Sequence, residues 1–241
     1  MIKYNIKHLD IIDSTNSYAI NLRESKDFKE GLVITTNFQK KGQGQRGSIW
    51  ESQKGKNILL SVVFEFNISI KKQFDICKLV SLSLIKLLSN LNIDAKIKWP
   101  NDILVKNKKI AGILINNIIS KDLISYSVIG IGLNVNQHVF NKYIPMATSI
   151  FLETGLQNNI EEIQYKLLEQ IKFDIVNYFQ SKNISSKYLD FLYRINKVSF
   201  FESGSQKFNG IIRGVEDSGL LIVETENEII KFNTKEIKIL F

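Results

Sequence analysis

The pattern of apolar residues changes near residue 196, and this change constrains the possible folds more than any other feature of the sequence. Before it, β-branched runs alternate with helical stretches such as 74–91, in which apolar residues recur every three to four positions. After it, short strand-like runs are separated by turn sequences rich in glycine, serine and asparagine. We therefore predict an α+β domain over residues 1–195 and a small all-β barrel over residues 196–241.

The larger unit is predicted to contain one sheet and several helices. β-branched and aliphatic runs bounded by glycine, proline or asparagine are typical of strands. A side-chain oxygen just before a periodic apolar stretch, as in Ser14, is typical of a helix start. The expected strands are 31–36, 57–66, 95–99, 103–106, 109–116 and 123–135, and the expected helices are 13–25, 74–91, 160–180 and 185–195.

The cysteine, the charge and the apolar runs of the chain exclude several classes of protein. Cys77 is the only cysteine, so no intrachain disulfide can form, and its apolar surroundings indicate a small core side chain. The longest apolar runs, such as 58–66, are too short to span a membrane, and the first residues do not resemble a signal peptide. Lysines are scattered rather than clustered, so the net charge of +8 does not identify a partner. We expect a soluble cytoplasmic protein.

A glycine-rich loop between the first two expected strands is the first candidate site. It spans Lys40 to Trp50 and contains three glycines, at which backbone N–H groups can approach phosphate oxygens closely. Arg46 can pair with a phosphate or carboxylate, and Trp50 offers a flat apolar face to a base. The spacing fits neither a Walker loop nor a dinucleotide fingerprint. A polar hairpin loop without a ligand is the alternative for this segment taken alone.

Three later segments combine polar groups or glycines with strand-like sequence. Lys98-Trp99-Pro100-Asn101-Asp102 places a cation and two polar side chains at a strand interruption, although a turn would also explain its second half. Lys109-Ile110-Ala111-Gly112 carries a strand glycine, which often marks a close approach to the backbone. Gly130, Gly132 and Asn134 share one strand face, although a bulged strand end is the alternative. Neither histidine has the neighbours of a triad or metal site.

In this order, four segments together resemble the biotin protein ligase family. They are Ser14-Thr15-Asn16, the Gly42 to Trp50 loop, Lys98 to Asp102 with Lys109 to Gly112, and Gly132-Leu133-Asn134. The resemblance implies a class II synthetase-like catalytic domain with a mixed, mostly antiparallel sheet, followed by a small SH3-like β-barrel. Larger relatives also carry an N-terminal DNA-binding domain, so the resemblance here implies a monofunctional ligase that binds neither DNA nor a membrane.

The resemblance also implies an activity and its partners. The expected reaction forms biotinoyl-5'-AMP from biotin and ATP, and then transfers biotin to a lysine of a carrier domain such as that of acetyl-CoA carboxylase. Mg²⁺ is expected to arrive with ATP, without a metal site of the protein's own. The protein is expected to be a monomer or a homodimer. A lipoate or octanoate ligase is the nearest alternative, and a basic nucleic-acid-binding module is a weaker one.

By position, the resemblance implies three sets of site residues. The biotin-binding set is Ser14, Thr15, Asn16, Gln39, Gly42, Gly44, Arg46, Lys109 and Gly112. The set that binds ATP or the adenylate is Gln43, Gln45, Arg46, Trp50, Asn101, Lys109 and Asn134. The catalytic set is Lys109 and Arg46, which stabilise developing negative charge, and Asp102, which orients or deprotonates the acceptor amine. The loop departs from many relatives in having glutamine instead of arginine at 43 and 45, which predicts weaker retention of the adenylate.

Overall fold

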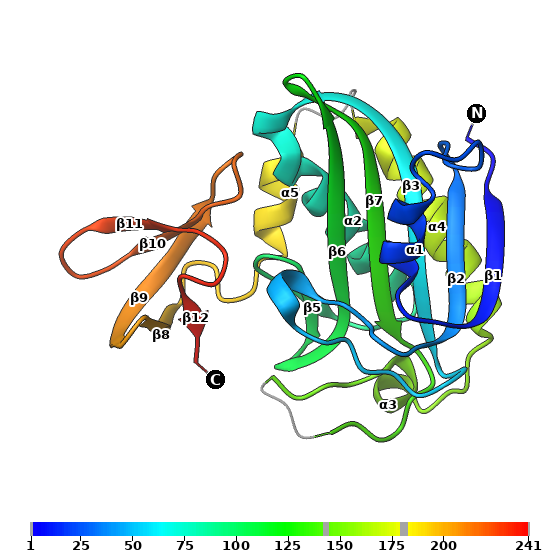
Figure 1. Ribbon diagram of the computed structural model, residues 1–241. Helices are drawn as coiled ribbons and strands as arrows, with labels where there is room; N and C mark the ends of the chain where they lie inside the picture. The colour runs from blue at the N-terminus through cyan, green and yellow to red at the C-terminus, as the bar shows by residue number, and fades with distance from the viewer. Residues whose placement is uncertain (1, 142–144, 179–182, 241) are drawn as a thin grey trace.

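The fold is built on two separate sheets. The computed structural model describes residues 2–141, 145–178 and 183–240, except for the side chain of Arg46. A seven-stranded sheet has the order β1-β2-β3-β7-β6-β5-β4, and a five-stranded sheet has the order β11-β10-β9-β8-β12. Figure 1 shows the two sheets side by side, with the helices gathered on the larger one. The predicted α+β class, with a small C-terminal antiparallel unit consistent with an SH3-like barrel, is confirmed.

The elements follow one another along the chain as strands interrupted by a few helices. The larger unit contains β1 (Asn5–Ile12), α1 (Thr15–Asn21), β2 (Leu32–Gln39), β3 (Asn57–Ser69), α2 (Gln73–Ser89), β4 (Ala95–Lys98), β5 (Asp102–Val105), β6 (Lys108–Ser120), β7 (Leu123–Asn134), α3 (Ile150–Thr154), α4 (Ile160–Val176) and α5 (Ile184–Asp190). Short 3-10 helices lie at Gln45–Gly47 and Ile70–Lys72. The second sheet contains β8 (Val198–Ser203), β9 (Gln206–Val215), β10 (Leu221–Glu224), β11 (Ile229–Phe232) and β12 (Lys238–Ile239).

The pairing of the strands in the larger sheet is mixed, as predicted. Only β1 and β2 are parallel, and the other neighbours among the described strands are antiparallel. The long strands β3, β7 and β6 form the middle of the sheet, where Gly132 of β7 lies opposite both Leu59 and Gly112. Gly112 in turn lies opposite Asp102 of β5. The register therefore gathers residues from three of the segments that were singled out in the sequence.

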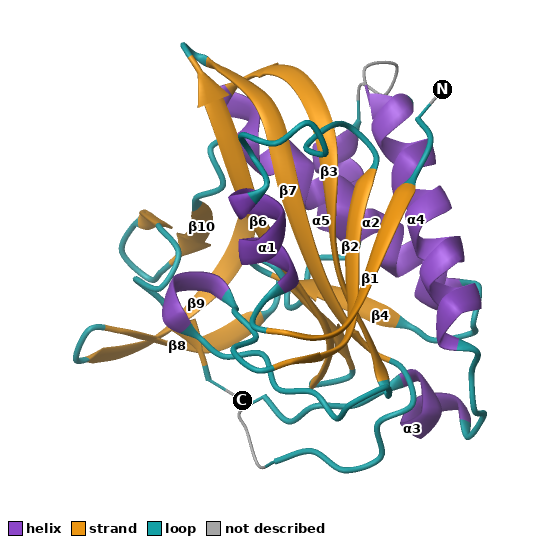
Figure 2. Cartoon of the chain, turned by 45° about the vertical axis from the view of Figure 1, so that its right-hand side comes forward, coloured by secondary structure: helices purple, strands orange, loops and turns teal. Residues whose placement is uncertain are grey.

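Helices cover both faces of the larger sheet. Alternate residues of a strand point to opposite faces, so Val33 packs in the core under α2 and α4, whereas Leu32 and Ile34 pack with Ala19 of α1. Figure 2 shows α1 on one face and α2, α4 and α5 on the other. Leu84 of α2 is completely buried, and burying one such side chain contributes roughly 1.5–3 kcal/mol. The apolar clusters on the two faces thus fix the position of the sheet beneath the loops at its end.

The expected elements are found with shifted ends. The predicted helix 13–25 is shorter and begins after Ser14, whose side chain accepts a hydrogen bond from Ser17 N at 3.4 Å. β1 and α3 were missed. Cys77 is buried in α2, with its Sγ 3.2 Å from the carbonyl oxygen of Pro100, and burial raises the pKa of its thiol to about 12. The prediction of a small core side chain is therefore confirmed.

Candidate active site

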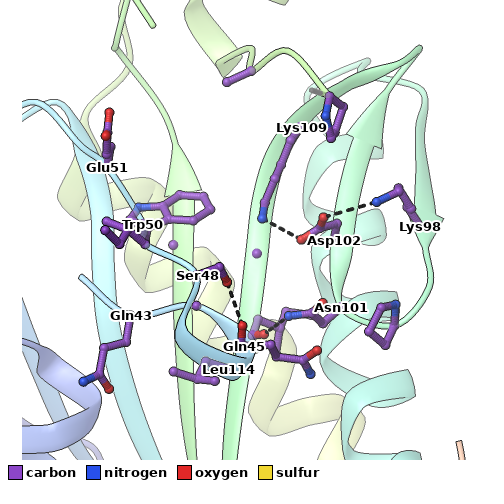
Figure 3. Close-up of a pocket in the computed structure, with 18 of the residues that line it drawn as sticks. Gln43, Gln45, Ser48, Trp50, Glu51, Lys98, Asn101, Asp102, Lys109 and Leu114 are labelled. Carbon is purple, nitrogen blue, oxygen red and sulfur yellow. Dashed lines mark hydrogen bonds and ion pairs between the residues drawn. The ribbon is translucent and has the colours of Figure 1, made fainter. Parts of the chain in front are cut away.

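A pocket of about 780 Å³ opens between the end of the larger sheet and the C-terminal sheet. Its walls come from the start of α1, the loop after β2, the segment between β4 and β5, and strands β6 and β7. Lys238 of β12 and Tyr193 line it from the C-terminal side. Figure 3 shows Trp50 on one side of the pocket and the Lys98, Asp102 and Lys109 side chains on the other. A concave space with a few convergent polar groups is typical of a small-molecule site.

The floor of the pocket is bare backbone at two paired glycines. Gly112 and Gly132 lie opposite each other on β6 and β7, and both line the pocket. The Trp50 ring lies directly against them, because a Cβ on Gly132 would be 2.4 Å from Trp50 Cε2 and a Cβ on Gly112 would be 3.0 Å from Trp50 Cζ3. Trp50 Nε1 is buried without a hydrogen-bond partner among the described residues. The absence of side chains at Gly112 and Gly132 therefore leaves room for the flat Trp50 ring above the two strands.

A carboxylate lies between two lysines at one side of the pocket. Asp102 Oδ1 is 2.6 Å from Lys109 Nζ, and Asp102 Oδ2 is 3.8 Å from Lys98 Nζ. Lys109 Nζ is also 5.3 Å from the centroid of the Trp50 ring. Burial lowers the pKa of Lys98, and the cations Lys109 and Lys238 lower it further against the opposing effect of Asp102. This side of the pocket can bind an anion and can also hold an incoming amine.

A hydrogen-bond network at the start of α1 forms the opposite end of the pocket. Gln39 Oε1 accepts hydrogen bonds from Thr15 N at 2.8 Å and from Thr15 Oγ1 at 3.1 Å. Ser61 Oγ of β3 donates to Thr15 Oγ1 at 2.9 Å, and Asn16 Nδ2 donates to the Leu114 carbonyl at 3.2 Å. The sequence did not single out Ser61, which is completely buried inside an apolar run. The network fixes the polar side chains that face the pocket.

The glycine-rich loop folds back on itself above the pocket. Gly44 N donates to the Ser48 carbonyl at 2.7 Å, and Trp50 N donates to the Gly42 carbonyl at 2.9 Å. Between these bonds lies the 3-10 turn Gln45–Gly47, in which Gly47 has a φ of +81°. The predicted residues Gln43, Gly44 and Gln45 line the pocket, whereas Gly42 does not line it.

Gly42 packs at the base of the loop, where a Cβ would be 2.3 Å from the Trp50 carbonyl oxygen and 3.2 Å from Gln39 Nε2. The close approach explains why a side chain is not accommodated at this position. The side chain of Arg46, which the resemblance assigns to both binding sets and to the catalytic set, lies outside the described residues.

Two predicted asparagines lie on different walls of the pocket. Asn134 Nδ2 donates to the Thr148 carbonyl at 2.9 Å, which leaves Asn134 Oδ1 buried and without a partner among the described residues. Asn101 Nδ2 donates to the Ile113 carbonyl at 2.6 Å and so ties the β4–β5 segment to β6. A buried acceptor without a partner is costly unless a ligand supplies a donor. Asn134 is therefore suited to recognise a hydrogen-bond donor.

A wall that the sequence did not indicate lies after β7, in residues 135–141 and 145–149. Residues of this segment, among them Gln137 and Ala147, line the pocket. Residues 146–148 lie beside β6, where Lys109 N donates to the Met146 carbonyl at 2.7 Å and Thr148 N donates to the Lys109 carbonyl at 2.9 Å. The segment has no motif of its own, and its position depends on these long-range bonds. Among the residues that the structure describes, no group of three or more His, Cys, Asp or Glu side chains could hold a metal ion.

The comparisons with known proteins decide the family. The profile described as "Biotin/lipoate A/B protein ligase family" matches residues 9–134, which contain most of the pocket residues described above. The chain belongs to this family. A second profile, "Biotin protein ligase C terminal domain", matches residues 201–237. The predicted membership of the biotin protein ligases and the predicted ligase activity are confirmed.

Individual relatives match over nearly the whole chain. The "Bifunctional ligase/repressor BirA" of Bacillus spizizenii is 27% identical over 95% of this chain and 72% of its own length. The "Biotin--[acetyl-CoA-carboxylase] ligase" of Mycobacterium tuberculosis is 24% identical over 96% of this chain and 88% of its own length. Among solved structures, the biotin protein ligase from Aquifex aeolicus in complex with biotin and ATP has a TM-score of 0.78 and 25% identity, and the match covers 98% of each chain. None of the described helices is long and apolar enough to cross a membrane.

Proposed function

We propose that this ligase joins biotin to ATP to form biotinoyl-5'-AMP, and then transfers biotin to a lysine of a biotin carboxyl carrier domain. The observation that carries the proposal is the pocket itself, which places the Thr15–Gln39 hydrogen-bond network, the paired glycines and the Asp102–Lys109 ion pair around one space. The Aquifex aeolicus ligase, whose structure holds biotin and ATP, has the same fold. The mycobacterial relative is named for acetyl-CoA carboxylase, which makes that enzyme's carrier domain the first acceptor to test.

In the first half-reaction, a carboxylate oxygen of biotin attacks the α-phosphorus of ATP. A new P–O bond forms, the bond between the α-phosphorus and the bridging oxygen breaks, and pyrophosphate leaves. Lys109 lies beside the glycine floor and supplies positive charge for the oxygens on which negative charge develops. Arg46 is proposed to act with it, while Ser14, Thr15, Asn16 and Gln39 hold the polar end of biotin. Fixed charges in a pocket act without reorganising at the moment of reaction.

The nucleotide is proposed to bind at the Trp50 and Asn134 side of the pocket. The Trp50 ring can cover the adenylate, and the buried Asn134 Oδ1 can accept a hydrogen bond from the amino group of adenine. Gln43, Gln45 and Asn101 are the further residues that we assign to the nucleotide. The cations beside Asp102 leave few free carboxylate oxygens in this region, so Mg²⁺ is proposed to bind through the phosphates of ATP, where it offsets their charge.

In the second half-reaction, the ε-amine of the carrier lysine attacks the carbonyl carbon of the mixed anhydride. A C–N bond forms, the bond from the carbonyl carbon to the phosphate oxygen breaks, and AMP leaves. We assign Asp102 to orient the amine and to receive its proton, because its carboxylate is fixed between Lys98 and Lys109 at the edge of the pocket.

We also propose that the chain is divided into a catalytic domain, residues 1–195, and a C-terminal domain, residues 196–241. The proposed location of the protein is the cytoplasm.

Mass spectrometry of a biotin carboxyl carrier domain tests this function. The domain is incubated with the protein, ATP, Mg²⁺ and biotin, beside reactions with lipoate, with octanoate or without ATP. An ATP-dependent gain of one biotin on a single lysine is the expected result. A gain with lipoate or octanoate but not with biotin would move the protein to the other branch of its family, and no gain with any of the acids would contradict the proposed function.

A further inference from the structure

A turn of the C-terminal sheet reaches the larger unit at the segment that carries Asp102. The turn is Asp217-Ser218-Gly219, between β9 and β10, and it is closed by a bond from Gly219 N to the Glu216 carbonyl at 2.9 Å. Trp99 Nε1 donates a hydrogen bond to the Gly219 carbonyl at 2.8 Å. Trp99 stands between Lys98 and Asp102 in the chain and is itself buried, with 8% of its surface exposed. The two sheets are thus joined within three residues of the proposed catalytic carboxylate.

The same turn is fixed to the N-terminal part of α2 by two further contacts. Asp217 Oδ1 is 3.5 Å from Nζ of Lys78, a side chain with only 1% of its surface exposed. Lys78 Nζ also contacts Asp75 Oδ1 and Ser185 Oγ, each at 2.9 Å, so its three N–H groups face three oxygens. Gly219 has a φ of +97°, and a Cβ there would be 2.9 Å from Cδ2 of the Phe74 ring. The turn fits this place because position 219 has no side chain.

The segment from Lys98 to Asp102 is anchored on several sides. Lys98 pairs with Asp102 and Asp102 with Gly112 in the larger sheet, and Ile113 N donates to the Asn101 carbonyl at 3.0 Å. Cys77 Sγ lies 3.2 Å from the Pro100 carbonyl oxygen on the α2 side, and Asn101 Nδ2 donates to the Ile113 carbonyl at 2.6 Å on the β6 side. The Trp99 indole adds a hydrogen bond to the C-terminal sheet, so the segment is held from a second sheet as well. A group that must meet a reacting atom needs supporting contacts that hold it within a fraction of an ångström. The C-terminal turn provides such a contact for this segment.

We propose that the turn Asp217–Gly219 is a positioning element of the reaction, because it fixes Trp99 and thereby holds the Lys98–Asp102 segment where Asp102 faces Lys109. The role rests on the proposed function, in which Asp102 assists the transfer to the carrier lysine. It gives the C-terminal sheet a part in the chemistry besides its residues in the pocket wall. Trp99 and Gly219 do not touch the reacting atoms in this scheme, and they act through the placement of Asp102.

Two variants of the full chain test the positioning role. Trp99→Phe keeps an aromatic ring but removes the N–H donor, and Gly219→Ala forces the turn away from Phe74. Each is expected to slow transfer from preformed adenylate to the carrier by about tenfold, the effect of losing one buried hydrogen bond and leaving its partner unpaired. The double variant is expected to be slower by about the same tenfold rather than a hundredfold, because both changes break one contact. Ser218→Ala is the matched control, since the one hydrogen bond of Ser218 Oγ among the described residues goes to Glu216 Oε2, at 3.2 Å, within the same turn region.

The amount of adenylate formed in the first turnover separates positioning from unfolding. This amount measures how much of the enzyme is correctly folded. It is expected to equal the wild-type amount in both single variants and in the control. An unchanged transfer rate in Trp99→Phe, a fall in adenylate that matches the fall in rate, or a hundredfold loss in the double variant would each overturn the positioning role. A wild-type protein that forms no biotinoyl adenylate would instead overturn the proposed function, and the positioning role with it.

Discussion

Replacing Gly132 by alanine places a methyl group where the Trp50 ring now lies. The new Cβ would be 2.4 Å from Trp50 Cε2, 2.6 Å from Cζ2 and 2.8 Å from Cδ2, whereas ordinary contacts are 3.4–4 Å. The ring must therefore move by about 1 Å or more, since the opposing atoms belong to a rigid aromatic group. The backbone at Gly132 is in the centre of the sheet and cannot retreat.

The expected cost follows from the size of this overlap. Overpacking of this kind costs typically about 1–3 kcal/mol. Trp50 belongs to a loop, so the ring can relieve the overlap by leaving the glycine floor, and the free energy of unfolding should change little. A ligand that requires the Trp50 ring above Gly132 must then bring back the overlap. A ligand that binds without the ring must instead lie against the new methyl group. We therefore expect KM for biotin, ATP or both to rise by a factor of about 5 to 150.

Fluorescence and steady-state kinetics measure the two consequences together. The chain has only two tryptophans, so the source of an emission change in Gly132→Ala can be assigned. If adding Gly132→Ala to Trp50→Phe leaves the emission unchanged, the change in the single variant comes from Trp50. Gly214→Ala in β9 is the matched control, because its Cβ would meet no atom closer than 3.9 Å. If Gly132→Ala keeps the wild-type emission and the wild-type KM for both substrates, the reasoning about the glycine floor is refuted.

Three further predictions concern charge, retention of the adenylate and stability. Lys109→Met should slow adenylate formation by about 10²–10³-fold in pyrophosphate exchange, whereas Lys108→Met on the exposed face of the same strand should not. Gln45→Arg should slow the release of biotinoyl adenylate, and an unchanged release rate in a trapping assay would contradict the weak-retention hypothesis. Tyr188→Phe should raise the free energy of unfolding by about 1 kcal/mol in urea, because the Tyr188 hydroxyl is buried without a partner among the described residues. Burial raises the pKa of Tyr188, so the wild type should lose stability above about pH 10, where the unfolded tyrosine ionises, and the variant should lose less.

Much of the fold could be predicted from the periodicity of the sequence. β3 and β7 are nearly continuous apolar runs, and α2 carries apolar residues on most of its surface because it is enclosed between the sheet, α4 and α5. β1 was missed because it is an exposed edge strand in which charged residues such as Lys7 and Asp10 interrupt the apolar pattern. Its parallel pairing with β2 is a long-range contact that no local pattern encodes.

The candidate site was predicted as a set of motifs but not as a geometry. Lys109, Gly112, Gly132 and Asn134 could be named because glycines and polar residues are uncommon in buried strands, and because the resemblance to the biotin protein ligases covers their segments. The sequence did not show that Trp50 lies on the glycine floor, since this depends on how the loop folds back through the bond from Trp50 N to the Gly42 carbonyl. It also did not show the contribution of the C-terminal sheet, because Lys238 lies in no motif and reaches the pocket only through the packing of the two sheets.

The buried position of Cys77 makes the protein well suited to chemical labelling. Its thiol is the only one in the sequence, it is enclosed in α2, and burial raises its pKa to about 12. Alkylating dyes react with the thiolate, and a thiol with this pKa stays protonated at neutral pH. A cysteine introduced at an exposed position of the C-terminal sheet, such as Lys207, would therefore be the single reactive thiol of the folded chain. A dye at that position could report the arrival of a carrier domain without prior removal of Cys77.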